Sequence, residues 1–430
     1  MWMMRVILLF VLMWITGQNT YGQALQDFDY IDYTYVPHIR SVQFKGTQKQ
    51  TSNFPVVQLN RGNLFFSFDD LTEQQLEYTY RVIHCDRNWK PTNLPVEEYV
   101  DGFDYEEIRN AAFSRNTYTD YVHYELQIPN RRYQWLISGN YLLVVYEGDR
   151  NNGVPVITRR FMVAEQTVDV GIQVKRPIKV SKLNTHQEFD FFVNYEEFPI
   201  GNPLQEITAT VLQNGRWSTA IADLKPNFIS NYRMNFNFQD RVIFPAGKEF
   251  RNFDIRSLEY TSRWVHSIDL KPFGTDVILR MQRSRKNQNY TFLPDLNGSF
   301  FITNNDNDFQ YNRDADVTAD YANVVFALEI EPIEDDREIY AIGSFSGWQP
   351  LPEYKLEYDP VNEIYTNQEL FKQGYYDYIY AVLGNDGLDS EQLEGNNYQT
   401  VNNYQILIYY RDFSGRYDRL IAAKTFEFTY

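Results

Sequence analysis

The sequence predicts an all-β fold, built from tandem immunoglobulin-like β-sandwich domains with few short helices. Phe, Trp and Tyr make up 17% of the 430 residues, and aromatic side chains pack well on the pleated, half-buried surface of a sheet. Short stretches that alternate between apolar and polar residues, or are apolar throughout, recur with turn-forming residues between them. Only residues 72–78 (TEQQLEY) and 95–111 (PVEEYVDGFDYEEIRNA) favour helix, for one or two turns each.

Residues 1–22 have the features of a cleavable signal peptide. A short basic start (MWMMR) precedes an apolar run of about a dozen residues, and the small residues Thr20 and Gly22 precede the expected cleavage point. The apolar run is shorter than the ~20 residues that cross a bilayer, and no other run approaches that length. No Cys follows it, which excludes lipid attachment there. We expect an exported protein without direct membrane insertion, in which residues 23–34 form an extended leader.

The first predicted domain is a sandwich over residues 35–165. Its clearest element is SGNYLLVVYEGDRNNGVPVITRRFMVAE, where an apolar strand, a turn rich in Gly, Asn and Asp, and a returning strand predict a β-hairpin. The returning strand is typical of the last strand of an immunoglobulin-like sandwich. We therefore place the end of this domain near Glu165.

The second predicted domain spans residues 167–300. It opens with VDVGIQVKRPI, HQEFDFFVNY and EITATVLQNGRW, and DVILRMQRS and GSFFIT are interpreted as its closing strands. Residues 301–322 contain few apolar residues and many turn formers, so they are predicted to be a linker.

The third predicted domain is an immunoglobulin-like, early-set sandwich over residues 323–430. Its last two strands, NYQILIYYRD and RLIAAKTFEFTY, are joined by a charged turn that contains Gly. The first domain ends in the same order of apolar strand, turn and apolar strand, which suggests repeated sandwich units.

Charge and cysteine content exclude several classes of function. The formal net charge is −17, whereas nucleic-acid binding needs a basic surface, as does electrostatic adhesion to anionic lipid. Cys85 is the only cysteine, so an intramolecular disulfide is impossible.

No pattern of residues predicts an enzyme, a metal site or a cofactor. In HCD (84–86), His84 and Asp86 would share one face of a strand while Cys85 points the other way, which is the wrong arrangement for a Cys–His pair. The five His residues (38, 84, 123, 186 and 266) have no zinc-type spacing. The DND at 306–308 lacks the Gly and Glu that complete a calcium loop. The signatures G-x-S-x-G, H-E-x-x-H and the phosphate loop are absent.

Residues 341–350 (AIGSFSGWQP) raise the hypothesis of carbohydrate binding. Gly343, Phe345 and Trp348 form the pattern G-x-F-x-x-W, which resembles the first hairpin of small sandwiches that bind starch and glycogen. Phe345 and Trp348 are the candidate glycan-binding residues. A second aromatic surface could come from KQGYYDYIYAV, where Tyr376, Tyr378 and Tyr380 would share one face of a strand. The alternative is that the hairpin is structural and both rings are buried.

Ten segments, in order along the chain, carry a second resemblance. They are HCDRNWKP (84–91), EYVDGF (98–103), FSRNTYTDYVHYELQIPN (113–130), SGNYLLVVY (138–146), TRRFMV (158–163), QNGRW (213–217), GKEFRNFD (247–254), GSFSGW (343–348), KQGYYDY (372–378) and DRLIA (418–422). Together they resemble the plug proteins of the type IX secretion system, over about residues 30–425. Each segment alone is weakly specific, whereas ten in order are specific.

The resemblance implies a non-enzymatic periplasmic protein that associates with the outer membrane. Such a protein binds the periplasmic opening of the large translocon β-barrel of this system and seals it when no substrate is engaged. A monomer within a hetero-complex is the expected state, and the sequence does not identify the contact residues. Two alternatives remain open, a carbohydrate-binding protein that uses residues 341–350 and an enzyme such as a glycosidase without a visible signature.

Overall fold

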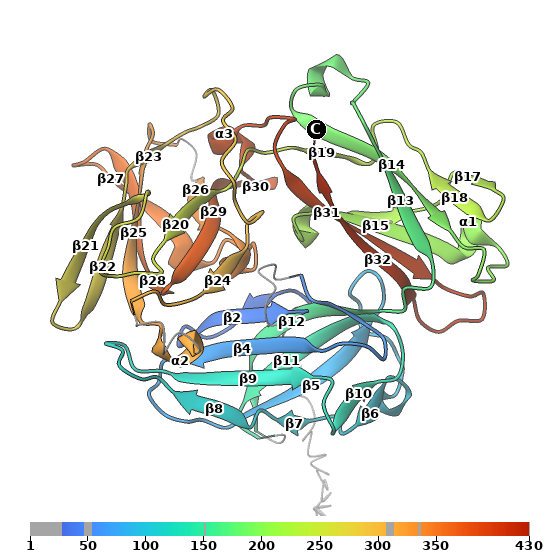
Figure 1. Cartoon of the computed structure of the whole chain (residues 1–430), viewed down its shortest axis with the longest axis horizontal. Coiled ribbons are helices and arrows are strands. Elements are labelled where there is room, and N and C mark those ends of the chain that lie inside the picture. The colour runs from blue at the N-terminus through green and yellow to red at the C-terminus, as the bar shows by residue number, and fades with distance from the viewer. Residues whose placement is uncertain (1–27, 47–53, 150–151, 307–313, 334–336, 430) are drawn as a thin grey trace, which may run out of the picture.

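Three β-sandwiches surround a common centre in the computed structural model, which describes residues 28–46, 54–149, 152–306, 314–333 and 337–429 (Figure 1). This confirms the all-β sandwich class predicted from the sequence. The predicted signal peptide, residues 1–22, lies outside the described residues. Among the described residues, no helix combines the length and the hydropathy of a membrane-crossing segment.

The first sandwich holds the N-terminal part of the chain, in blue to blue-green in Figure 1. One sheet has the order β1 (Tyr33–Thr34), β12 (Val154–Ala164), β11 (Gly139–Glu147), β5 (Tyr78–Cys85) and β7 (Glu106–Glu107), with β3 (Val56–Gln58) beside β12. The other has the order β2 (Ile39–Lys45), β4 (Leu64–Asp70), β9 (Val122–Ile128) and β8 (Asn110–Phe113). A small two-stranded antiparallel sheet pairs β6 (Val100–Gly102) with β10 (Tyr133–Trp135).

The second sandwich contains strands from two distant parts of the chain. One sheet has the order β13 (Asp169–Lys175), β14 (His186–Asn194), β18 (Arg233–Phe236) and β17 (Phe228–Ser230), with β19 (Ile243–Pro245) beside β14. The other has the order β16 (Ile221–Leu224), β15 (Ile207–Gln213), β31 (Asn402–Tyr410) and β32 (Arg419–Phe428). Short helical turns are η2 (Val180–Lys182), α1 (Pro203–Glu206) and η3 (Trp217–Thr219).

The third sandwich is one long sheet folded on itself around a core rich in Phe and Tyr. Its order is β20 (Arg251–Asp254), β29 (Gly374–Gly384), β26 (Glu338–Ile342), β27 (Lys355–Asp359), β28 (Ile364–Lys372), β25 (Tyr321–Glu329), β22 (Gly274–Leu279) and β21 (Val265–Lys271). Three short strands join it, β23 (Gln282–Arg283) beside β25, and β24 (Phe300–Ile302) and β30 (Gly387–Asp389) beside β29. The helical turns are α2 (Ala315–Thr318), η4 (Ser344–Ser346), η5 (Pro352–Tyr354) and α3 (Glu391–Glu394).

The domains are therefore not in tandem, and the predicted boundaries of the second and third domains need correction. The chain leaves the second sandwich after β19, forms the whole third sandwich, and returns with β31, which pairs with β15 from Ile207↔Tyr410 to Gln213↔Tyr404. The last two strands of the segment 323–430, β31 and β32, therefore belong to the second sandwich and not to the third. The predicted closing strands of the second domain belong to the third sandwich, as β22 and β24. A strand pattern shows that a strand forms but not which distant strand pairs with it.

Two smaller predictions also change. The end of the predicted leader is part of the first sandwich, because Tyr33 and Thr34 pair with Thr158 and Ile157. The predicted linker 301–322 contains α2, the end of β24 and the start of β25, although residues 307–313 are not described. The segment 95–111 forms the single helical turn η1 (Val96–Glu98) before short strands, and 72–78 forms no helix.

The first two sandwiches share an apolar interface. Strand β11 is buried on both faces, because Leu143 and its alternate neighbours point into the first core while Leu142, Val144 and Tyr146 point toward the second sandwich. Strand β31 does the same in reverse, with Leu407 and Tyr409 meeting them. Such strands have nearly continuous apolar sequences because both faces are covered.

Candidate functional site

The predicted glycan-binding residues lie in a turn that is packed into the protein. Phe345 stacks edge-on against Tyr354 at 5.0 Å and against Phe371 at 5.2 Å between ring centroids, at the edge of the third core. This geometry agrees with the structural alternative for Phe345, because its ring already has aromatic neighbours inside the sandwich.

Trp348 lies at the meeting point of the second and third sandwiches. The Arg216 guanidinium stands 5.0 Å from the centroid of its ring, and the Phe250 ring lies 5.8 Å away. Gly298 approaches so closely that a Cβ there would collide with the indole. A sugar needs an open aromatic face, and the neighbours of this indole occupy that space.

The Tyr row on β29 also faces inward. Tyr376, Tyr378 and Tyr380 share one face as expected, and all three are buried. Tyr376 stacks between Phe253 and Phe300 at 4.9 and 5.3 Å. These rings build the third core and do not form a platform on the surface.

The HCD segment likewise has structural contacts. His84 is buried, with Nδ1 3.0 Å from the Thr92 hydroxyl and Nε2 3.3 Å from the Ser138 carbonyl. Burial lowers the pKa of His84 to about 4 and raises the pKa of the Cys85 thiol. A neutral buried imidazole beside an inaccessible thiol is not an activated nucleophile.

The N-terminal segment is fastened where the three sandwiches meet. The Asp32 carboxylate accepts a hydrogen bond from the backbone N–H of Arg160 at 2.7 Å, and the Arg160 Nε donates to the Tyr30 carbonyl at 2.7 Å. The Arg160 guanidinium lies over the rings of Trp89 and Trp217, at 4.7 and 5.5 Å. These contacts join residues of the leader, the first sandwich and the second sandwich.

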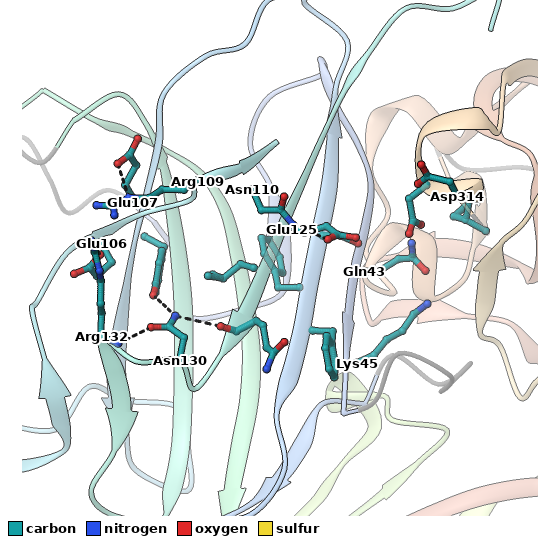
Figure 2. A pocket seen from close by; sticks show the side chains of 18 of the residues that line it. Gln43, Lys45, Glu106, Glu107, Arg109, Asn110, Glu125, Asn130, Arg132 and Asp314 are labelled. Atoms are coloured by element: carbon teal, nitrogen blue, oxygen red, sulfur yellow. Dashed lines mark hydrogen bonds and ion pairs between the residues drawn. The ribbon is translucent and has the colours of Figure 1, made fainter. Parts of the chain in front are cut away.

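A cleft of about 940 Å³ separates the first and third sandwiches. Its walls are the outer face of the sheet that contains β2, β4 and β9, and the segment around Asp314, as Figure 2 shows. Glu125 projects toward the segment of Asp314, while Lys45 lies farther along the same wall. The lining is predominantly polar and charged.

At one end of the cleft, a buried polar network joins the first sandwich to the third. Asp69 of β4 accepts hydrogen bonds from Lys372 Nζ, from the Tyr321 hydroxyl and from His123 Nδ1, each at 2.6 Å. Burial alone would raise the pKa of the Asp69 carboxyl, but Lys372 and His123 hold it below its ordinary value. Burial alone would lower the pKa of His123, and the bond to Asp69 raises it to about 9.

Further ion pairs fix the same two sandwiches. Arg40 pairs with Glu369 at 2.9 Å in a partly buried position, and Arg115 pairs with Asp314. Between the first and second sandwiches, Arg419 holds Glu165 at 2.6 Å. The three sandwiches are therefore connected by apolar and ionic contacts as well as by the chain.

Comparison with known proteins identifies the family. Residues 39–165 match the family model described as "Type 9 secretion system plug protein 1st domain". The chain belongs to the type 9 secretion system plug family. The match covers the first sandwich from β2 to the end of β12, and among the described strands only the short β1 precedes it.

One solved structure is similar to this plug-family chain over nearly its whole length. It is a hypothetical protein from Parabacteroides merdae ATCC 43184, with 30% sequence identity and a TM-score of 0.87, and the alignment covers 93% of this chain and 100% of that one. The C-terminal domain of the Streptococcus pyogenes antigen I/II-family protein AspA aligns over 89% of this chain and 98% of its own, at 8% identity and a TM-score of 0.17. A TM-score of 0.17 does not indicate a shared fold. No curated protein matches the chain.

The interdomain network was not predicted from the sequence. His123 and Glu125 alternate on one strand as H-x-E, which places both side chains on the same face. This spacing could have predicted that His123 and Glu125 lie on the same face of their strand. Nothing in the sequence indicated that Asp316 and Lys372, far along the chain, would meet it.

Proposed function

We propose that this protein closes the periplasmic opening of the large outer-membrane translocon barrel of the type 9 secretion system when no substrate is engaged. The observation that carries the proposal is the match of the first sandwich to the plug family model. In this proposal the protein is exported by residues 1–22, works in the periplasm beside the outer membrane, and acts as a monomer in a hetero-complex.

The architecture supports a mechanical role. A plug must keep its shape under a load from the pore, and here every sandwich is joined to its neighbours by buried side chains. The third sandwich is connected at two points, because the chain both leaves and returns to the second sandwich. Two connections restrict rotation far more than one flexible linker would.

The action proposed is non-enzymatic. The sealed barrel and the substrate-engaged barrel are competing states, and release requires the substrate machinery to bind one state better than the other. The carbohydrate-binding alternative has no supporting contact, because Phe345 and Trp348 pack against other side chains.

Co-purification tests the partner directly. The tagged protein, expressed at its native level, is isolated from outer membranes solubilised in mild detergent. We expect it to retain a very large β-barrel protein in near one-to-one amount. The matched control is a chain of the same length with Leu142→Asp, which places a charge in the interface between the first and second sandwiches. Recovery of the intact chain without any barrel would contradict the proposal.

A further inference from the structure

Three side chains with metal-ligating atoms meet where the first and third sandwiches face each other. His123 and Glu125 project from β9, and Asp316 comes from α2 in the third sandwich. One ligand atom from each lies within 4.8 Å of the other two. The group is therefore assembled only when the two sandwiches are docked.

The His123 ring presents a buried nitrogen to this group. His123 is 4% exposed, and its Nε2 has no hydrogen-bond partner among the described residues. The distance from Nε2 to Glu125 Oε1 is 3.6 Å, too long for a hydrogen bond. Two ligands that each lie ~2.1 Å from a tetrahedral ion are separated by about 3.4 Å, so a small side-chain rotation would bring both atoms to one ion.

The other ring nitrogen is held as in known metal sites. His123 Nδ1 lies 2.6 Å from Asp69 Oδ1, and Asp69 Oδ2 is fixed by Lys372 and Tyr321. A carboxylate on the far nitrogen of a metal-binding His fixes the orientation of the ring and makes it a stronger ligand. The ring therefore cannot turn its Nε2 away without breaking the interdomain network.

We propose that His123, Glu125 and Asp316 bind a divalent transition-metal ion, for which Zn²⁺ fits best. One imidazole and two carboxylates suit Zn²⁺, whereas Ca²⁺ and Mg²⁺ prefer oxygen ligands alone. Glu125 and Asp316 line the cleft, so water from the cleft can supply a fourth ligand. An ion here replaces the proton on Nε2, balances the two carboxylates, and ties β9 of the first sandwich to α2 of the third.

Zn²⁺ titration of the untagged mature protein, stripped of metal by a chelator, tests the site. Calorimetry should detect one equivalent of Zn²⁺, and Glu125→Gln or Asp316→Asn should each weaken its binding at least tenfold. The matched control is Glu107→Gln, because Glu107 lines the same cleft but pairs with Arg109 at 2.8 Å. The control should bind as the parent does. Absence of Zn²⁺ binding, or equal binding by all four proteins, would overturn the proposal.

A stability measurement gives a second readout. Zn²⁺ should raise the thermal unfolding midpoint of the parent and of Glu107→Gln, because an ion that binds only the folded state stabilises it. The midpoint of Glu125→Gln should not rise. An equal rise with Mg²⁺ in place of Zn²⁺ would contradict the assignment of an imidazole ligand. Neither test depends on the proposed sealing of a barrel, so their failure leaves that proposal in place.

Discussion

His84 shows at the scale of one residue how burial sets the response of the protein to pH. Its side chain is 1% exposed, and burial lowers its pKa to about 4, against ~6.5 in an unfolded chain. As the pH falls from 7.5 to 5, the unfolded chain binds a proton at His84 and the folded chain does not. The contribution of His84 to the unfolding free energy is therefore fully present above the pKa of His84 in the unfolded chain. It is lost as the pH falls toward the lower pKa of His84 in the folded chain.

The His84→Gln variant measures this contribution. We expect the parent to lose about 2 kcal/mol more unfolding free energy than the variant between pH 7.5 and pH 5. Urea unfolding at the two pH values gives the difference. His266→Gln, which changes an exposed His on β21, should keep the dependence of the parent. A parallel loss in the parent and in His84→Gln would contradict the assignment.

Lys372 is the cation on which the buried network depends. It is 1% exposed, donates to Asp69 and to the Asp316 carbonyl, and lies 4.1 Å from the centroid of the Tyr121 ring. Without Lys372 the buried Asp69 carboxylate keeps His123 as its one ionic partner in the described network, and loss of one partner of a buried ion pair is strongly destabilising, so Lys372→Met should lower the unfolding free energy by about 3–5 kcal/mol.

Urea unfolding of Lys372→Met at neutral pH checks this value. Arg283→Met provides the comparison, because Arg283 pairs with Glu329 on the surface and exposed pairs contribute little. That control should unfold at the urea concentration of the parent. Equal effects of the two substitutions would show that the network does not bear on stability.

At the residue scale, the sequence predicted which side chains share a face of a strand better than it predicted whether that face is buried. The alternation of β29 correctly placed Tyr376, Tyr378 and Tyr380 on one face, because strand periodicity is local. It did not predict that this face is the core. The partly buried environment of Trp348 depends on Arg216 and Phe250, which lie on distant segments, so no local pattern could indicate it.

At the scale of elements, the structure confirms the predicted strands and changes their pairing. The hairpin of β11 and β12 forms as predicted, since a short turn specifies an antiparallel neighbour. Strands β31 and β32 also form a hairpin, but β31 continues the sheet of β15. The nearly continuous apolar sequence of β31 is typical of a strand covered on both faces, but it does not specify which distant strands cover it.

The third sandwich is an insertion whose two ends meet. The Gly247 carbonyl accepts hydrogen bonds from the backbone N–H of Asn397 at 2.7 Å and from the Thr400 hydroxyl at 2.9 Å. We expect that replacing residues 249–395 with a short Gly-Ser linker leaves the second sandwich folded, because its strands and core stay intact. Hydrogen exchange followed by mass spectrometry should show that β15 amides remain protected.

A chain that ends at residue 400 is the contrasting variant. It keeps the third sandwich but lacks β31, the direct partner of β15. Its β15 amides should lose protection. Protection in the truncated chain, or its loss in the excised chain, would contradict the insertion.

At the scale of the whole molecule, three sandwiches form one body with two kinds of interface. The first and second share an apolar layer, while the first and third are joined by the buried network around Asp69 and by ion pairs. The resemblance to the family rested on ten sequence segments, and the family model matches the region that holds the first five of them. The insertion of the third sandwich and the cleft could not be predicted from the sequence, because both arise from contacts between distant segments.

Outer-membrane permeability tests most directly whether this body seals a secretion pore, as we propose. Uptake of a large antibiotic is measured in a strain that lacks the gene and keeps the barrel, with and without a plasmid that supplies the full chain. We expect deletion to raise uptake and the full chain to restore the barrier. Unchanged uptake in the deletion strain, with the barrel present in the outer membrane, would contradict the account.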